Sequence, residues 1–247
     1  MATVACFYHN NIDMPLYAFR PVKDLINIMY SPACVSCGET LVGDESLLCI
    51  ECISHIPFTN FATTSNNQLE LLLENTIPHV KATSLMLFEK EEVSQRIIHG
   101  IKYHGNLRLG RRFGRLLGKT ITDSHRFDDV DIIIPVPLHF FRWYKRGFNQ
   151  SREISEGIVK TFKRPVKNFA LARTRYTETQ THKSHRERTY NVVGAFKVRN
   201  PKRLQGKHIL LVDDVITTGS TIRACYAALS QVEGVRVSVA SLAFAGE

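Results

Sequence analysis

The stretch ILLVDDVITTGST, Ile209–Thr221, joins an apolar run, two adjacent carboxylates and a loop rich in hydroxyl groups. Its first four residues predict a buried β-strand, and the residues from Gly219 onward predict an α-helix. The loop between them then lies at the carboxyl end of a strand and at the start of a helix. Open α/β sheets bind their ligands at this edge.

This loop has the chemistry of a sugar-phosphate site. Free backbone N–H groups and the helix dipole favour a phosphate, and glycine lets the backbone come close to it. Asp213 and Asp214 are then placed to accept hydrogen bonds from ribose hydroxyls. The residues predicted to hold the phosphate are Val215, Ile216, Thr217, Thr218, Gly219, Ser220 and Thr221. The alternative is a capped helix start with acidic residues on its dipole, which explains one Asp or one Thr but not the whole run.

Apolar runs alternate with helical patterns from about residue 69 onward. Strands are predicted at 82–88, 131–136, 192–198, 208–214 and 236–244, and helices at 94–103, 107–121, 149–162 and 219–231. Continuous apolar strands are typical of a parallel sheet that is covered on both faces. We therefore expect an α/β fold with a doubly wound, mainly parallel sheet.

A polar stretch at 59–68, TNFATTSNNQ, is interpreted as a linker. It divides the chain into a segment without a motif at 1–30, a zinc-binding module at 31–58 and an α/β domain at 69–247. Met14 is an alternative start to Met1, because every motif follows it.

Four of the six cysteines form two CxxC pairs, Cys34 with Cys37 and Cys49 with Cys52. Two such pairs can offer four thiolates to one Zn²⁺, and a site closed by four thiolates is structural. A redox site would need only one pair and a following helix, so we discount it. His55 is interpreted as a surface histidine in preference to a substitute ligand. Zinc ribbons also bind nucleic acids and proteins, and the spacing leaves that role open.

The 247-residue chain is 44% hydrophobic and 22% charged, with a formal net charge of +9. This charge suits polyanionic partners. The sequence contains neither an apolar run long enough to span a membrane nor the pattern of a secretory leader. We therefore expect a cytoplasmic protein.

Five motifs resemble, in order, those of the ComF (ComFC/GntX-like) competence-associated family, a branch of the type I phosphoribosyltransferases. They are CVSCG with LCIEC, IKYHGNLRLG, IPVPLHFFRWYKRGFNQS, TETQTHKSHRERTYNVVGAF and ILLVDDVITTGST, and they cover the chain from about Cys34 to its end. The last motif resembles the one that binds phosphoribosyl pyrophosphate (PRPP) in type I enzymes. The resemblance implies that a phosphoribosyl group passes from PRPP, bound with Mg²⁺, to an unidentified nitrogen acceptor, and that pyrophosphate is released.

The resemblance also implies a link to DNA uptake in natural transformation or to nucleotide salvage. Single-stranded DNA and competence helicase-type proteins are the partners it suggests. The alternative is a protein without catalysis that senses PRPP or nucleotides, or that handles single-stranded DNA.

Two further loops belong to the site by this resemblance. The loop after strand 131–136 would hold the pyrophosphate through Pro137, Leu138, Arg142, Arg146 and Gly147, since guanidinium groups suit phosphate oxygens. The polar segment 173–191 takes the place of the flexible loop that closes over the active site, with Thr179, Gln180 and Thr181 as candidate contacts. His182 and His185 are interpreted as solvated histidines, and no single catalytic residue is expected.

The helix predicted at 107–121 has an apolar face formed by Leu109, Phe113, Leu116 and Leu117. Its basic stripe is formed by Arg108, Arg111, Arg112, Arg115 and Lys119. No acidic residue lies between Gly105 and Thr122, so we expect that ion pairs within the helix leave the stripe unneutralised. The stripe is interpreted as a solvated face, with single-stranded DNA as the alternative occupant.

Overall fold

A four-stranded parallel sheet forms the centre of the molecule. The structure, a computed structural model, describes residues 32–43, 45–103, 105–138, 144, 147–174 and 194–246. The strand order is β1-β6-β5-β2, and every neighbouring pair is parallel. The strands are β1 (Ala82–Leu87), β2 (Ile132–Pro135), β5 (His208–Ile216) and β6 (Arg236–Phe244).

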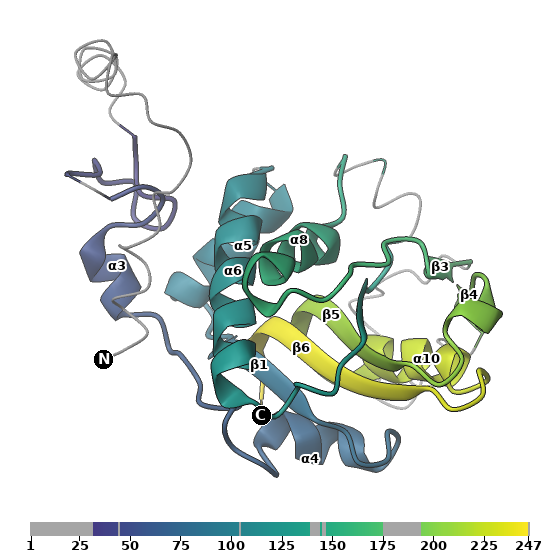
Figure 1. The fold of residues 1–247 in the computed structure, drawn as a ribbon. Coiled ribbons are helices and arrows are strands. Elements are labelled where there is room, and N and C mark those ends of the chain that lie inside the picture. Colours follow the sequence, from purple (N-terminus) through teal and green to yellow (C-terminus); the bar gives the residue numbers. More distant parts are fainter. Residues whose placement is uncertain are drawn as a thin grey trace, which may run out of the picture.

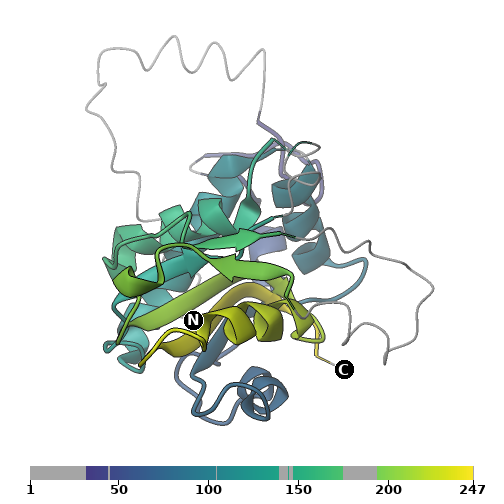
Figure 2. The same cartoon turned by 90° about the vertical axis from the view of Figure 1, so that its right-hand side faces the viewer.

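Helices cover both faces of this sheet (Figures 1 and 2). Those bordering it are α4 (Gln68–Glu74), α5 (Val93–Tyr103), α6 (Leu107–Ser124), α8 (Gln150–Phe162) and α10 (Ser220–Leu229). On one face, α5, α6 and α8 share a core with Leu210 of β5 and Leu242 of β6. On the other face, α4 and α10 pack around Leu211 and Val239. The predicted α/β fold with a doubly wound, mainly parallel sheet is confirmed.

Glycines bring α6 and α8 into close contact. A Cβ atom on Gly114 would lie 2.2 Å from the carbonyl oxygen of Ile154, and one on Gly157 would lie 2.2 Å from the carbonyl oxygen of Arg111. The two backbones can approach this closely only because both positions lack a side chain. The apolar side chains predicted to share a face of α6, at 109, 113, 116 and 117, are all buried.

A second, two-stranded antiparallel sheet lies apart from the first. It consists of β3 (Leu171–Arg173) and β4 (Phe196–Val198). The strand predicted at 192–198 is therefore shorter than expected and pairs outside the parallel sheet. The short helix η1 (Pro201–Arg203) lies between β4 and β5.

The polar stretch at 59–68 runs along β1, which is an edge strand. The N–H of Thr59 donates to the carbonyl oxygen of Leu85 at 3.0 Å. Asn67 is buried, and its amide group donates to the carbonyl oxygens of Phe61, Thr64 and Ala82. The polar side chains of this stretch thus fix it to the sheet.

The cysteine-bearing module, residues 32–56, packs beside α5 and α6. It contains α3 (Ile50–Ser54), and its buried side chains belong to the same core as those two helices. Arg96 of α5 donates to the hydroxyl of Ser36 at 2.9 Å, and Arg112 of α6 donates to that of Ser46 at 2.7 Å. A Cβ atom on Gly100 of α5 would lie 2.7 Å from a methyl group of Val35. The module therefore lies directly against the helical layer.

Candidate functional site

Two carboxylates near the end of β5 are held in fixed positions. Asp213 Oδ1 accepts hydrogen bonds from the hydroxyl of Ser151 at 3.0 Å and from the N–H of Asp214 at 2.9 Å. Asp214 Oδ1 accepts from the N–H of Val215 at 2.7 Å. Ser151 lies in the first turn of α8. The packing of α8 against α6 therefore also positions Asp213.

Lys102 is a member of this site that the sequence reasoning missed. Its Nζ atom lies 3.3 Å from Oδ2 of Asp214, and only 21% and 13% of the two side chains are exposed. Lys102 is in the last turn of α5. The only sequence signal was a lysine inside the motif IKYHGNLRLG, and nothing in that pattern points to Asp214. Ser151 was also missed, because nothing in the sequence around it indicates a contact with Asp213.

Asp213 is harder to ionise than an ordinary carboxyl group. Burial raises the pKa of Asp213 to about 7, and the neighbouring charge of Asp214 adds to the rise. The hydrogen bonds from Asp214 N–H and Ser151, together with the charge of Lys102, oppose it. The pair is thus poised to gain or lose a proton near neutral pH.

The connection from β5 to α10 is short, because β5 extends through Ile216 and α10 begins at Ser220. Gly219 is the N-cap, with a φ of 71°, and no side chain caps the first turn of α10. The first N–H groups of α10 are therefore available to an anion, and the capped-helix alternative is weakened. Gly219 is also required locally, since a Cβ atom there would lie 2.9 Å from a methyl group of Leu73.

Arg223 ties this loop to the rest of the fold. Its guanidinium donates to the carbonyl oxygens of Thr218 and of Leu72 in α4. The side chain of Ile216 is buried in the core. Among the residues predicted to hold the phosphate, Ile216 can therefore meet a ligand only through its backbone.

The loop predicted to hold pyrophosphate starts at the same edge of the sheet. The N–H of Val136 donates to the carbonyl oxygen of Val212 at 2.8 Å, so Pro137 and Leu138 follow beside Asp213. Gly147 has a φ of 77° and precedes α8. Arg142 and Arg146 lie outside the described residues, as do the flexible-loop candidates Thr179, Gln180, Thr181, His182 and His185. The described residues that flank that loop, Thr174 and Ala195, are joined by a backbone hydrogen bond of 2.8 Å.

The four paired cysteines come together as the spacing predicts. The Sγ atoms of Cys34, Cys37, Cys49 and Cys52 all lie within 4.8 Å of one another, and those of Cys37 and Cys49 are 3.7 Å apart. Ligands about 2.3 Å from a tetrahedral Zn²⁺ lie roughly 3.8 Å apart. The cluster is therefore compatible with a structural zinc ion. His55 is exposed, and its Nδ1 lies 2.7 Å from the carbonyl oxygen of Glu51 at the end of α3.

The expectation that ion pairs within the helix leave the basic stripe of α6 unneutralised is wrong at one position. Lys119 pairs with Asp123 one turn later at 2.9 Å. Arg111 pairs with Glu153 of α8 at 2.7 Å. The prediction failed at Lys119 because it stopped at Thr122, one residue before Asp123. The pair of Arg111 is formed with a neighbouring helix, which the prediction did not cover.

None of the described helices is both long enough and apolar enough to cross a bilayer.

Comparison with known proteins places the site in a recognised domain. The family described as phosphoribosyl transferase domain matches residues 135–247, which include Asp213, Asp214 and the loop after them. A solved structure of the allosteric regulatory enzyme of purine biosynthesis is 20% identical, with a TM-score of 0.35, and the match covers 52% of this chain and 25% of that chain.

Three curated relatives match about half of the chain. Competence protein F of Haemophilus influenzae is 34% identical over 130 residues, 51% of this chain and 57% of that protein. DNA utilization protein YhgH of Escherichia coli O157:H7 is 36% identical over 129 residues, 51% of this chain and 56% of that protein. Competence protein ComFC of Bacillus subtilis is 30% identical over 136 residues, 55% of this chain and 53% of that protein. The matched region thus spans little more than half the length of these relatives. The resemblance seen in the sequence is confirmed, because the chain carries a phosphoribosyl transferase domain and is a homologue of proteins named competence protein F, ComFC and DNA utilization protein YhgH.

Proposed function

We propose that the protein binds PRPP at the carboxyl end of β5 and transfers its phosphoribosyl group to a nitrogen acceptor. The observation that supports this most is the juxtaposition of two fixed carboxylates, Asp213 and Asp214, with the start of α10, which has no side-chain cap. These neighbouring features suit the hydroxyls and the 5-phosphate of one ligand. The matched phosphoribosyl transferase domain supports the same reading.

In this proposal the chain acts by position and charge. Asp213 and Asp214 accept hydrogen bonds from the ribose hydroxyls, and the loop from Thr217 to Thr221 holds the 5-phosphate. Arg142 and Arg146 bind the pyrophosphate. The bond between ribose C1 and a pyrophosphate oxygen breaks, a bond from C1 to the acceptor nitrogen forms, and that nitrogen loses a proton. Positive charge that develops at C1 is stabilised by the nearby carboxylates, so the protein needs no nucleophile of its own.

The donor set at the end of β5 also fits Mg²⁺. Asp213 and Asp214 offer carboxylate oxygens next to a loop suited to phosphate, and Mg²⁺ prefers one or two carboxylates together with substrate phosphates. When bound with PRPP, Mg²⁺ would supply positive charge that offsets the charge of the departing pyrophosphate.

Calorimetric titration with PRPP and Mg²⁺ tests the binding step. Asp213→Asn and Asp214→Asn keep the shape of each side chain but remove its charge. Each should weaken binding by about 1.5–3 kcal/mol, roughly ten- to a hundredfold. Asp128→Asn is the matched control, because Asp128 is an exposed carboxylate paired only with His125 among the described residues. Equal affinity in all four proteins, or no binding by the parent, would refute the assignment.

The transfer step needs a separate measurement. Pyrophosphate release is followed with PRPP, Mg²⁺ and a panel of bases and amines. Release that depends on one acceptor and is lost in Asp213→Asn supports an enzyme. PRPP binding without release across the panel supports the second candidate, a sensor without catalysis.

The link to DNA uptake is also a proposal. It is favoured by relatives named for competence and DNA utilization, and by the net charge of +9. In this role the protein would handle single-stranded DNA together with competence helicase-type proteins. DNA binding that survives the loss of both carboxylates would show that such a role does not need the PRPP site.

A further inference from the structure

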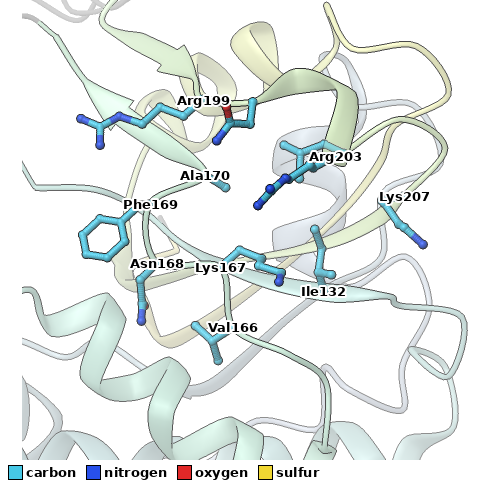
Figure 3. A pocket seen from close by; sticks show the side chains of 11 residues that line it. Ile132, Val166, Lys167, Asn168, Phe169, Ala170, Arg199, Arg203 and Lys207 are labelled. Atoms are coloured by element: carbon cyan, nitrogen blue, oxygen red, sulfur yellow. The ribbon is translucent and has the colours of Figure 1, made fainter.

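Figure 3 shows a pocket of about 530 Å³ beside the start of β2. It lies at the opposite end of the sheet from Asp213 and Asp214. It is lined by Ile132, by the segment 166–170 and by residues of the segment 199–207. Ile132 is the first residue of β2 and pairs with Ile209 near the start of β5, whereas the carboxylates lie near the end of β5. The pocket is therefore separate from the proposed PRPP site.

The pocket has a strongly positive rim. Lys167, Arg199, Arg203 and Lys207 line it, and its lining contains no acidic residue. Among the described residues, these four side chains form a single ion pair, in which Lys207 Nζ lies 3.8 Å from Asp131 Oδ1. In Figure 3 the guanidinium of Arg203 extends into the opening, across from Lys167. Such a rim suits a small anion such as a phosphate group.

The floor of the pocket has a different chemistry. Ile132 and Leu204 are buried apolar residues, while Phe169, which also lines the pocket, is 69% exposed. The side chain of Asn168 turns away from the opening (Figure 3), and its Nδ2 donates to Glu156 of α8 at 3.2 Å. The pocket therefore offers a ligand an apolar floor and one exposed aromatic residue.

Together these features describe an occupant that is anionic at one end and flat and apolar at the other. We propose that the pocket binds a nucleoside monophosphate, with its phosphate on Lys167 and Arg203 and its base against Phe169. Bases stack on exposed aromatic rings irrespective of their sequence. The volume lies within the range of small-ligand sites, about 300–1,000 Å³. This site is additional to the PRPP site and does not depend on it.

The test uses the full chain carrying Asp213→Asn and Asp214→Asn, so that a nucleotide cannot use the ribose-binding carboxylates. Adenosine 5′-monophosphate, adenosine and inorganic phosphate are titrated separately by calorimetry. We expect one site for the nucleotide, and affinities at least about tenfold weaker for adenosine and for phosphate, because each lacks one half of the recognition.

Substitutions then locate the site. Lys167→Gln with Arg203→Gln, and separately Phe169→Ala, should each weaken nucleotide binding by about tenfold or more. Lys202→Gln is the matched control, since Lys202 is exposed on η1 beside Arg203 but does not line the pocket. The side chains of Lys167, Phe169, Lys202 and Arg203 are exposed, so these substitutions should leave thermal unfolding of the doubly substituted chain unchanged. The proposal is overturned if the nucleotide does not bind, or if the control weakens binding as much as the pocket variants do. Because the tested chain lacks the two carboxylates of the proposed PRPP site, the result for the nucleotide is independent of the result for PRPP.

Discussion

Asp213 illustrates how a single residue can make the whole site depend on pH. Its pKa is raised to about 7 by burial and by the charge of Asp214, whereas an aspartate in an unfolded chain has a pKa of about 3.9. Only the ionised form acts purely as an acceptor at both carboxylate oxygens, because the protonated form carries an O–H donor at one of them. We therefore expect affinity for PRPP with Mg²⁺ to rise as the pH increases from about 6 to 8, measured by titration calorimetry in buffers of equal ionic strength. A flat profile would contradict the raised pKa.

The same shift makes a prediction for stability without ligand. Between about pH 4 and pH 7 the folded state holds a proton on Asp213 that the unfolded state has lost. The stabilisation of the parent relative to Asp213→Asn is therefore fully present below about pH 4 and is lost as the pH rises through 7. Denaturant unfolding of both proteins across this range measures the difference. A difference that grows with pH would show the opposite sign of shift.

Lys102 sets the charge balance of the pair. Its ammonium group lies beside Asp214 and lowers the pKa of Asp213. Lys102→Gln should move the midpoint of the pH profile for PRPP binding upward, whereas Lys102→Arg should leave it near the parent value. The midpoint distinguishes this role from a purely structural one, because a packing defect would lower affinity equally at every pH. No sequence pattern revealed this contact, since it joins the end of α5 to a strand far along the chain.

At the level of helices and strands, the α6–α8 contact depends on glycines at specific positions. Gly114→Ala would place a Cβ atom 2.2 Å from the Ile154 carbonyl oxygen, whereas at Gly110 the nearest atom is 3.5 Å away. We expect Gly114→Ala to destabilise the protein by about 1–3 kcal/mol or more. Gly110→Ala should be neutral or stabilising by up to about 1 kcal/mol. Denaturant unfolding measures the free energy of unfolding of both variants. Equal changes in the two would mean that α6 and α8 can move apart at no cost in stability.

The basic stripe of α6 can be tested on residues that do not hold the fold together. Arg111 is engaged with Glu153, so Arg108 and Arg115 are better targets. If the stripe binds single-stranded DNA, Arg108→Gln with Arg115→Gln should lower affinity and flatten its dependence on salt by about 0.7 for each phosphate that the protein no longer neutralises. Fluorescence anisotropy with an oligonucleotide measures both quantities. An unchanged salt slope would show that the stripe is only solvated.

Most elements of the central sheet follow from the sequence because their apolar runs are long and unbroken, as in β5 and β6. The exceptions have local causes. β3 is three residues long and shows no period. The stretch at 59–68 has the composition of a linker, but Asn67 satisfies three carbonyl groups, a role that composition does not reveal. Within the site, the carboxylates and the phosphate loop were predicted because they are contiguous, whereas Ser151 and Lys102 reach them only through tertiary packing.

At the scale of the whole molecule, the metal site should affect more than its own module. Cys34, Cys49 and Cys52 belong to the same buried core as α5, α6 and α8. Removal of the metal with a chelator, or Cys49→Ser, should therefore lower the melting temperature of the entire protein in a single transition, because the free energy of metal binding is part of the free energy of folding. Metal analysis should give one zinc per chain before treatment. Cys225→Ser serves as the control for metal content, since Cys225 is a buried residue of α10 in the other core, away from the cluster. A metal-free protein of unchanged stability would contradict this prediction.

The interface between the cysteine module and helices α5 and α6 also limits how the module can be exchanged between homologous proteins. Val35 of the module packs against Gly100 of α5. The hydroxyl groups of Ser36 and Ser46 accept hydrogen bonds from Arg96 of α5 and Arg112 of α6. A chimera that receives only the module of a homologue would break up these matched pairs even if its four thiolates were intact. A graft of the module therefore requires that the facing residues of α5 and α6 be transferred with it.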